Sequence, residues 1–157
     1  MKEQTCCFSG HRNIPSDEYV QIRNKLKITI TELIKKGVIY FGCGGARGFD
    51  MLAAETVLEA KETYPQIRLI MVFPCKDHTK FWDICDIEAI NRIKAQSDKN
   101  IYIAESFDNS CMFKRNRHLI NNSNYCICYF TRSNSGTGFT VDYAAKNGLT
   151  IINTAKI

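Results

Sequence analysis

Short runs of apolar residues alternate along the chain with longer stretches in which apolar residues recur at helical spacing. The short runs lack apolar–polar alternation, which is typical of strands buried on both faces of a sheet. They predict strands at residues 5–8, 38–41, 68–73, 100–103, 125–130 and 149–152. The longer stretches predict helices at residues 17–36, 48–61, 84–94, 112–122 and 138–147. Because strands and helices alternate, we expect an α/β fold with a mainly parallel sheet of about six strands, covered by helices on both faces.

Individual residues are expected to mark the ends of some of these elements. Ser16 precedes two acidic residues and is expected to cap the first helix, which Gly37 ends after a basic last turn. Pro74 is expected to stop the third strand because it has no N–H group for a sheet ladder.

The composition is that of an ordinary globular protein. The 157 residues are 45% hydrophobic and 24% charged, which predicts one domain over residues 1–157 with a core of normal size. No apolar stretch approaches the ~18 residues that cross a bilayer, and the N-terminus shows no signal-peptide pattern. We therefore expect a cytoplasmic protein that does not contact membranes.

Eight cysteines require an explanation in so short a chain. Six of them lie in predicted strands or at their ends, namely Cys6, Cys7, Cys43, Cys75, Cys126 and Cys128. No Cys-x-x-Cys pair or zinc-finger spacing is present, so we expect reduced thiols in the core and no metal. Cys43 and Cys75 follow strand ends, which leaves a redox role for these two open beside that of inert thiols.

A glycine-rich segment stands at each of two predicted strand-to-helix turns, at residues 43–50 and 135–140. Glycine lets a backbone approach a ligand closely, and the start of a helix offers free N–H donors with a partial positive charge. Two such segments in one small chain favour a ligand that carries phosphate groups. The formal net charge of +5 permits an anionic ligand, but the lysines are scattered rather than clustered, so we expect no nucleic acid.

Three segments carry a resemblance to a known superfamily. Residues 44–50 and 135–140 resemble the two glycine motifs of the SMF/DprA–LOG (SLOG) superfamily, and residues 8–12 are similar to its opening Gly-x-Arg segment. Cys75-Lys76, Trp82, residues 112–117 and Gly136-Thr137 resemble its single-domain YpsA/YoqJ-like branch in the same order, over essentially the whole chain. His78 and Ser135 depart from that branch, where glutamine and glycine are common. The resemblance implies a Rossmann-like three-layer sandwich.

The resemblance also implies a ligand and an assembly. It points to a nucleotide or a nucleotide-derived small molecule, such as an ADP-ribose- or NAD-like compound, that a homo-oligomer senses or sequesters. No resident cofactor is expected beyond that ligand. Phosphoribohydrolases of the superfamily carry a glutamate three residues after the threonine of their second motif. Thr140 stands there in this chain, which argues against the same reaction.

Two alternative functions remain open. The first is a nucleotide-hydrolysing enzyme, a nucleotide N-glycosidase or phosphohydrolase, that would use Asp50, Glu55 or Asp142 with a bound water. The second is a single-stranded nucleic-acid binder similar to DprA. The catalytic residues of any such reaction are unknown at this stage.

The predicted binding residues come from the segments that carry the motifs. They are Ser9, Gly10, His11, Arg12, Gly44, Gly45, Arg47, Gly48, Asp50, Trp82, Arg115, Asn116, Gly136, Thr137, Gly138 and Thr140. Arg12, Arg47 and Arg115 are expected to neutralise phosphate. Trp82 is expected to stack on a base, and Asp50 either to bind ribose hydroxyls or Arg12 or to balance a helix N-terminus. For His11 we expect a hydrogen-bonding role.

Overall fold

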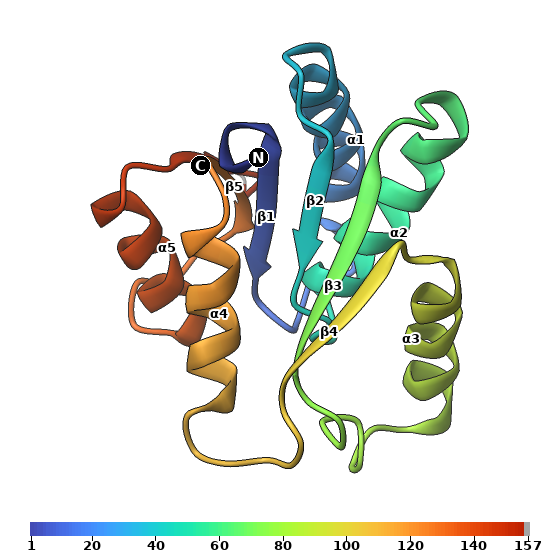
Figure 1. Cartoon of the computed structure of the whole chain (residues 1–157), viewed down its shortest axis with the longest axis vertical. Coiled ribbons are helices and arrows are strands. Elements are labelled where there is room, and N and C mark those ends of the chain that lie inside the picture. The colour runs from blue at the N-terminus through green and yellow to red at the C-terminus, as the bar shows by residue number, and fades with distance from the viewer. Residues whose placement is uncertain (156–157) are drawn as a thin grey trace.

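Parallel strands form one continuous sheet in the computed structural model of the chain, which describes residues 1–155. Within those residues the six strands are β1 (Thr5–Gly10), β2 (Tyr40–Cys43), β3 (Arg68–Cys75), β4 (Lys99–Ala104), β5 (Tyr125–Tyr129) and β6 (Thr150–Asn153). Their order across the sheet is β4-β3-β2-β1-β5-β6, as Figure 1 shows. The predicted α/β fold and its parallel sheet are confirmed.

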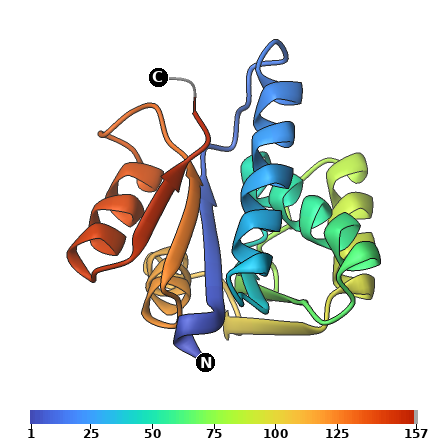
Figure 2. The same cartoon turned by 90° about the horizontal axis from the view of Figure 1, so that it is seen from above.

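Helices cover both faces of this sheet. Within residues 1–155 they are α1 (Tyr19–Lys35), α2 (Phe49–Thr63), α3 (Ile84–Gln96), α4 (Cys111–Asn121) and α5 (Gly136–Lys146), after a short 3-10 helix η1 (Lys2–Gln4). Helices α1, α2 and α3 lie on one side of the sheet, and α4 and α5 lie on the other (Figure 2). The result is the three-layer arrangement that the sequence predicts.

The order of the strands reverses next to β1. From β1 the chain adds β2, β3 and β4 in one direction, and it then crosses to place β5 on the opposite side of β1. All strands run the same way, so their carboxyl ends share the lower edge of the sheet in Figure 1. Ligands of such folds bind outside the carboxyl ends at the point of reversal, here between β1 and β5.

The core is divided by the sheet into two hydrophobic clusters. The larger one packs β1, β2 and β3 against α1 and α2, around Phe8, Phe41 and Phe49. The smaller one lies under α4 and α5 and includes Leu119 and Ile120.

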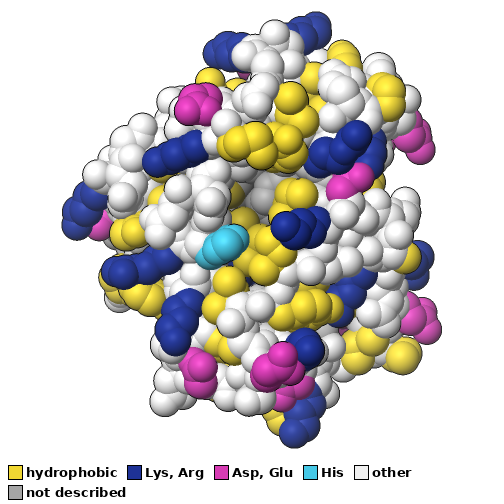
Figure 3. All heavy atoms as spheres, in the orientation of Figure 1, with side chains coloured by type: hydrophobic (Ala, Val, Ile, Leu, Met, Phe, Trp, Pro, Cys, Tyr) yellow, Lys and Arg dark blue, Asp and Glu magenta, His cyan; other side chains and the backbone are white. Residues whose placement is uncertain are grey.

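In Figure 3, hydrophobic side chains gather around a hollow near the centre of the face that α4 and β3 share. All eight cysteines are free and all but Cys85 are buried, so the six cysteines expected in the core do lie there, and their reduced state stays an expectation.

Two expected element ends are wrong. Helix α1 begins at Tyr19, because the Glu18 amide donates to the Pro15 carbonyl at 2.9 Å and closes a turn in which Ser16 caps nothing. Strand β3 continues through Pro74 to residue 75. Proline is tolerated there because β2 already ends opposite Met71, which leaves that side of β3 without a ladder partner.

The start of α5 also differs from the prediction, and this changes the place of the second glycine segment. Helix α5 begins at Gly136, two residues before the predicted start, and Ser135 is its N-cap. The glycines of this segment therefore form the first turn of a helix rather than a loop in front of one.

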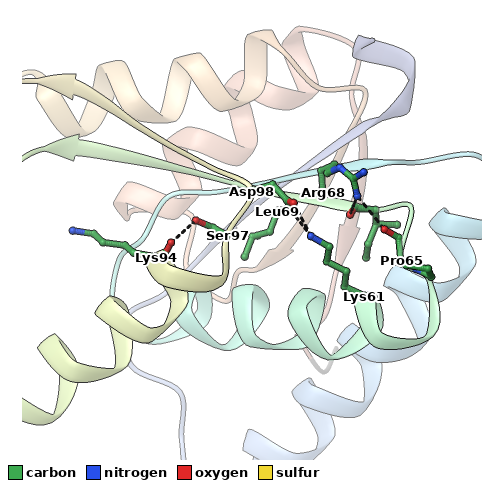
Figure 4. Close-up of polar contacts among 8 residues, drawn as sticks. Lys61, Pro65, Arg68, Leu69, Lys94, Ser97 and Asp98 are labelled. Carbon is green, nitrogen blue, oxygen red and sulfur yellow. Dashed lines mark hydrogen bonds and ion pairs between the residues drawn. The ribbon is translucent and has the colours of Figure 1, made fainter.

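A polar cluster at the opposite end of the sheet links β3 and α2 to the segment between α3 and β4 (Figure 4). Asp98 accepts from Lys61 Nζ at 2.6 and 2.8 Å and from the backbone amide of Leu69 at 2.8 Å. Beside it, Arg68 donates to the carbonyl of Pro65 at 3.0 Å. Burial alone would raise the pKa of Asp98, but the hydrogen bonds from Lys61 and Leu69 outweigh it and lower that pKa.

Replacing Asp98 tests this cluster. Asp98→Ala leaves the Leu69 amide without its acceptor and should lower the free energy of unfolding by about 1–3 kcal/mol in urea denaturation. Asp98→Asn keeps an acceptor for that amide and loses only the partly exposed ion pair, so its loss should stay below about 1 kcal/mol. Because the pKa is lowered, the charged contribution is present near neutral pH and fades as the pH falls below about 4. Equal losses in the two variants would contradict the role given to the Leu69 bond.

Candidate functional site

A cavity of about 740 Å³ opens at the carboxyl edge of the sheet between β1 and β5. We call it the first cavity. Its walls come from the segment after β1, the segment after β5, the start of α5, one side of α4, and two residues that follow β2. These are Phe8, Ser9, Gly10, His11, Arg12, Asn13, Ile14, Pro15, Ala46, Asp50, Met112, Arg115, Asn116, Tyr129, Thr131, Arg132, Ser135, Gly136, Thr137 and Thr140. The cavity therefore occupies the position at which this fold binds ligands.

The first turn of α5 forms one wall with unpaired donors. Ser135 caps the helix, because its Oγ accepts from the Gly138 amide at 3.0 Å and its carbonyl accepts from the Phe139 amide at 3.0 Å. Gly136 and Thr137 line the cavity, and within residues 1–155 neither of their amides has a hydrogen-bond acceptor. Two free N–H groups at the positive end of an 11-residue helix suit an anion.

The two glycines of this turn serve different purposes. A Cβ at Gly138 would overlap the carbonyl of Ser133, so the loop can close onto the helix only if this residue is glycine. A Cβ at Gly136 would meet no atom of residues 1–155 within 4 Å, so this position is open toward the cavity it lines.

His11 joins the ends of three elements. Its Nε2 accepts from the Thr131 amide at 3.0 Å, its own amide donates to the Tyr129 carbonyl at 3.2 Å, and its carbonyl accepts from the Phe49 amide at 3.2 Å. Burial and the nearby Arg132 lower the pKa of His11, so the ring is neutral at pH 7, with its proton on Nδ1. His11 thus has the hydrogen-bonding role expected of it.

Two buried charges of opposite sign flank Gly44. Arg115 is 6% exposed, donates through Nη1 to the Gly44 carbonyl, and donates through Nε to Oδ1 of Asn116 at 2.7 Å. Asp50 is equally buried, and its Oδ2 accepts from the Ala46 amide at 3.2 Å. Its Oδ1 has no hydrogen-bond partner within residues 1–155. Burial raises the pKa of Asp50 to about 6, and the charge of Arg115 opposes that rise.

The glycines of the first glycine segment pack against protein and do not line the first cavity, although Ala46 and Asp50 of the same segment do. Gly45 and Gly48 have φ values of +72° and +78°, which other residues rarely adopt. A Cβ at Gly45 would overlap the Phe73 ring, and one at Gly48 would overlap the Arg12 carbonyl. These glycines let the segments after β1 and β2 lie against one another and against β3, and a role in phosphate binding stays a prediction for them.

The structure brings together ten of the predicted binding residues in the first cavity. They are Ser9, Gly10, His11, Arg12, Asp50, Arg115, Asn116, Gly136, Thr137 and Thr140. Six others do not line it, namely Gly44, Gly45, Arg47, Gly48, Trp82 and Gly138. Sequence reasoning missed Thr131 and Arg132, although a cation directly after a strand end was a signal that could have found Arg132.

Arg47 and Trp82 line a second cavity of about 440 Å³. We call it the second cavity. It is lined by Arg12, Ala46, Arg47, Pro74, Asp77, His78, Lys80, Phe81, Trp82, Phe107, Met112 and Arg115. The guanidinium of Arg47 lies over the Trp82 ring, 5.3 Å from its centroid.

The other chemical candidates lie outside the first cavity. Glu55 lines a groove between α2 and α3, and Asp142 pairs with Lys146 at 2.9 Å on the exposed side of α5. Cys43 donates to the Asp50 carbonyl at 2.9 Å, and burial raises the pKa of Cys75 to about 12. Both thiols are therefore protonated at neutral pH, as inert core cysteines are.

Comparison with known proteins places this site in a family. Residues 10–150 match the YpsA model, described as the YspA SLOG family. The chain belongs to the YpsA SLOG family. It is 29% identical over 147 residues to the SPbeta prophage-derived protein YoqJ of Bacillus subtilis, covering 83% of this chain and 84% of YoqJ. It is 30% identical over 77 residues to a UPF0398 protein of Enterococcus faecalis, of which the match covers only 43%.

Two solved structures share the fold of this YpsA-family chain. DNA processing protein A (DprA) from Helicobacter pylori, for which a single-stranded DNA binding mode is described, superposes with a TM-score of 0.70 at 22% identity. DprA from Streptococcus pneumoniae superposes with a TM-score of 0.69 at 15% identity. The chain spans 65% and 50% of the lengths of these two proteins, respectively. Within residues 1–155, no helix has the length and apolar character to cross a membrane.

The buried carboxylate gives a pH signature. Because its folded-state pKa is raised to about 6, Asp50 favours folding below about pH 4 and loses that contribution as the pH rises through 6. Asp50→Asn has no such titration. Its stability relative to the natural protein should therefore improve by about 2 kcal/mol between pH 4 and pH 8 in urea denaturation.

Asp142→Asn is the matched control, because Asp142 is exposed on α5. This control makes the same substitution without removing a buried carboxylate. A pH-independent difference for Asp50→Asn would show that Asp50 ionises normally.

Proposed function

We propose that this YpsA-family protein binds a nucleotide or a nucleotide-derived phosphorylated small molecule, such as an ADP-ribose- or NAD-like compound, and acts as a sensor or sequestering protein. The observation that carries the proposal is the first cavity, where the free amides of Gly136 and Thr137 stand beside Arg12 and Arg132 at the point of strand reversal. Backbone donors, a helix dipole and guanidinium groups in one cavity are the features that bind phosphate.

The exposed arginines suit a phosphate better than the buried one does. Arg12 and Arg132 are exposed, and the one side-chain bond of Arg12 within residues 1–155 runs to Met112 Sδ at 3.6 Å. Most of their donors are therefore free for a ligand. Arg115 is already bonded to Gly44 and Asn116, so it supports a ligand mainly through its positive charge.

Groups for the sugar of such a ligand stand nearby. Ser9, Thr131 and Thr137 line the first cavity and carry hydroxyls that both donate and accept hydrogen bonds. Asn116 keeps its amide nitrogen as a donor, because its Oδ1 already accepts from Arg115. A phosphorylated ribose would find partners for both its charge and its hydroxyls.

Binding without turnover fits the carboxylates better than hydrolysis does. Three carboxylates were considered for an enzyme, and of these Asp50 lines the first cavity. Glu55 lines a groove elsewhere, and Asp142 pairs with Lys146 on the exposed side of α5. A carboxyl with a pKa of about 6 can exchange a proton near neutral pH, so hydrolysis stays an alternative. Self-association and a cytoplasmic location remain expectations from the sequence.

A thermal-shift screen tests this proposal. Nucleotides, NAD, ADP-ribose, cyclic ADP-ribose isomers and cyclic dinucleotides are added to the purified protein, and a ligand that binds only the folded state raises its melting temperature. Arg132→Glu should weaken binding of the best ligand roughly 10- to 100-fold, since a charge-assisted hydrogen bond contributes ~1.5–3 kcal/mol.

Lys25→Glu is the control for that variant, because it makes the same change of charge on the exposed side of α1. Mass spectrometry of the recovered ligand separates a sensor, which leaves it intact, from an enzyme, which alters it. A screen without any stabilising compound would contradict the proposed function.

Single-stranded DNA is a second candidate ligand. The supporting observation is the fold shared with H. pylori DprA, for which a single-stranded DNA binding mode is described. Exposed Phe81 and Phe107 near Lys80 also provide the aromatic and basic groups that stack and hold single strands. Against it, Lys and Arg side chains are scattered over the face in Figure 3 and form no continuous stripe.

Fluorescence anisotropy with labelled oligo-dT decides between the candidates. DNA binding should weaken with salt at a log–log slope of about −0.7 for each phosphate contacted. We expect either that the DNA does not bind at low salt or that the best small ligand does not displace it. Tight, salt-sensitive binding that this ligand displaces would favour the DprA-like function.

A further inference from the structure

Large aromatic side chains surround the second cavity. Phe81, Trp82 and Phe107 all line it, and Phe81 is 90% exposed while Phe107 is 57% exposed. Pro74 and Met112 add further apolar surface. An exposed group of large apolar side chains around a cavity marks a place where something binds, because water is a poor partner for it.

Trp82 is held in a fixed orientation within this group. Arg47 lies over its ring, and His78 contacts it edge-on with ring centroids 5.3 Å apart. His78 is fixed in turn, because its Nδ1 donates to the Cys75 carbonyl at 3.1 Å. Its ring also packs on the Phe73 ring, with the two ring centroids 4.9 Å apart. A preorganised indole loses little side-chain entropy when a flat ring stacks on it.

The two cavities share a wall. Arg12, Ala46, Met112 and Arg115 line both of them, and Arg12 Nη2 contacts Met112 Sδ at 3.6 Å. The far side of the first cavity carries Arg132 and the start of α5, which do not line the second. Positive groups therefore stand at two successive points along a path that leads from α5, past Arg12, to Trp82.

We propose that the second cavity is a nucleobase subsite, so that the ligand is a nucleoside diphosphate or a derivative of one. The base stacks beside Trp82, and the diphosphate passes Arg12 to reach Arg132 and the free amides of α5. This inference rests on the proposed function and deepens it, because it assigns the base to the second cavity and the phosphates to the first. The polar first cavity suits phosphate and sugar, whereas the aromatic second cavity suits a flat ring.

The chain carries its own reporter for this arrangement. Trp82 is the single tryptophan of the 157 residues, so all tryptophan emission reports on the second cavity. ADP and inorganic pyrophosphate are titrated into the natural protein, and binding of each is measured in parallel by calorimetry. We expect ADP to cause a saturable change in Trp82 emission, and pyrophosphate to bind without one.

Two substitutions separate the halves of the ligand. Trp82→Ala should raise the Kd for ADP by about 5- to 150-fold, the range that loss of one base–aromatic stack produces. It should leave the Kd for pyrophosphate unchanged. Trp82→Phe should restore most of the affinity for ADP. Phe113→Ala is the matched control, since Phe113 is an exposed aromatic residue of α4 that does not line the second cavity.

The outcomes distinguish this inference from the function beneath it. If ADP binds with unchanged Trp82 emission and with the same Kd in Trp82→Ala, the base lies elsewhere, and the inference is overturned while the proposed function stands. If pyrophosphate binds and ADP does not, the inference is likewise overturned. If neither binds and the thermal-shift panel is also negative, the proposed function fails as well.

Discussion

The site depends on the bonds of one buried imidazole. His11 receives a hydrogen bond from the segment after β5 and, through its backbone, contacts the end of β5 and the start of α2. Strands β1 and β5 are neighbours in the sheet, but the chain between them runs through β2, β3 and β4. A neutral ring that accepts from Thr131 therefore ties the end of β1 to the segment after β5, and both segments form walls of the first cavity.

Charge is arranged around the same place in two layers. The buried layer is Asp50 and Arg115, which flank Gly44 and leave the carboxylate incompletely paired. The exposed layer is Arg12 and Arg132, neither of which forms an ion pair within residues 1–155. The inner pair costs stability near neutral pH, since burial raises the pKa of Asp50. Within the buried layer Arg115 supplies a positive charge near the cavity, which the ionised Asp50 carboxylate partly offsets at neutral pH.

Much of the fold was predictable because its signals are local. Uniformly apolar runs such as residues 69–73 identify buried parallel strands, and helical periodicity identifies the segments between them. The error at Pro74 came from tertiary context, because nothing near it in the sequence indicates that β2 has already ended beside it. The error at Ser16 was local, because a turn between Pro15 and Glu18 delays the start of α1. The candidate site was predicted only in part. Its motif positions are visible in the sequence, but that Trp82 lines the second cavity and not the first follows from packing alone.

The distribution of thiols makes this chain unusually convenient to label. Cys85, in the first turn of α3, is the one exposed cysteine among eight, and the other seven are shielded by the core. A maleimide dye would therefore attach at a single position, and no other cysteine would have to be replaced first. That position lies three residues after Trp82, so the natural chain contains an energy-transfer donor that lines the second cavity and, close to it in sequence, an attachment point for the acceptor.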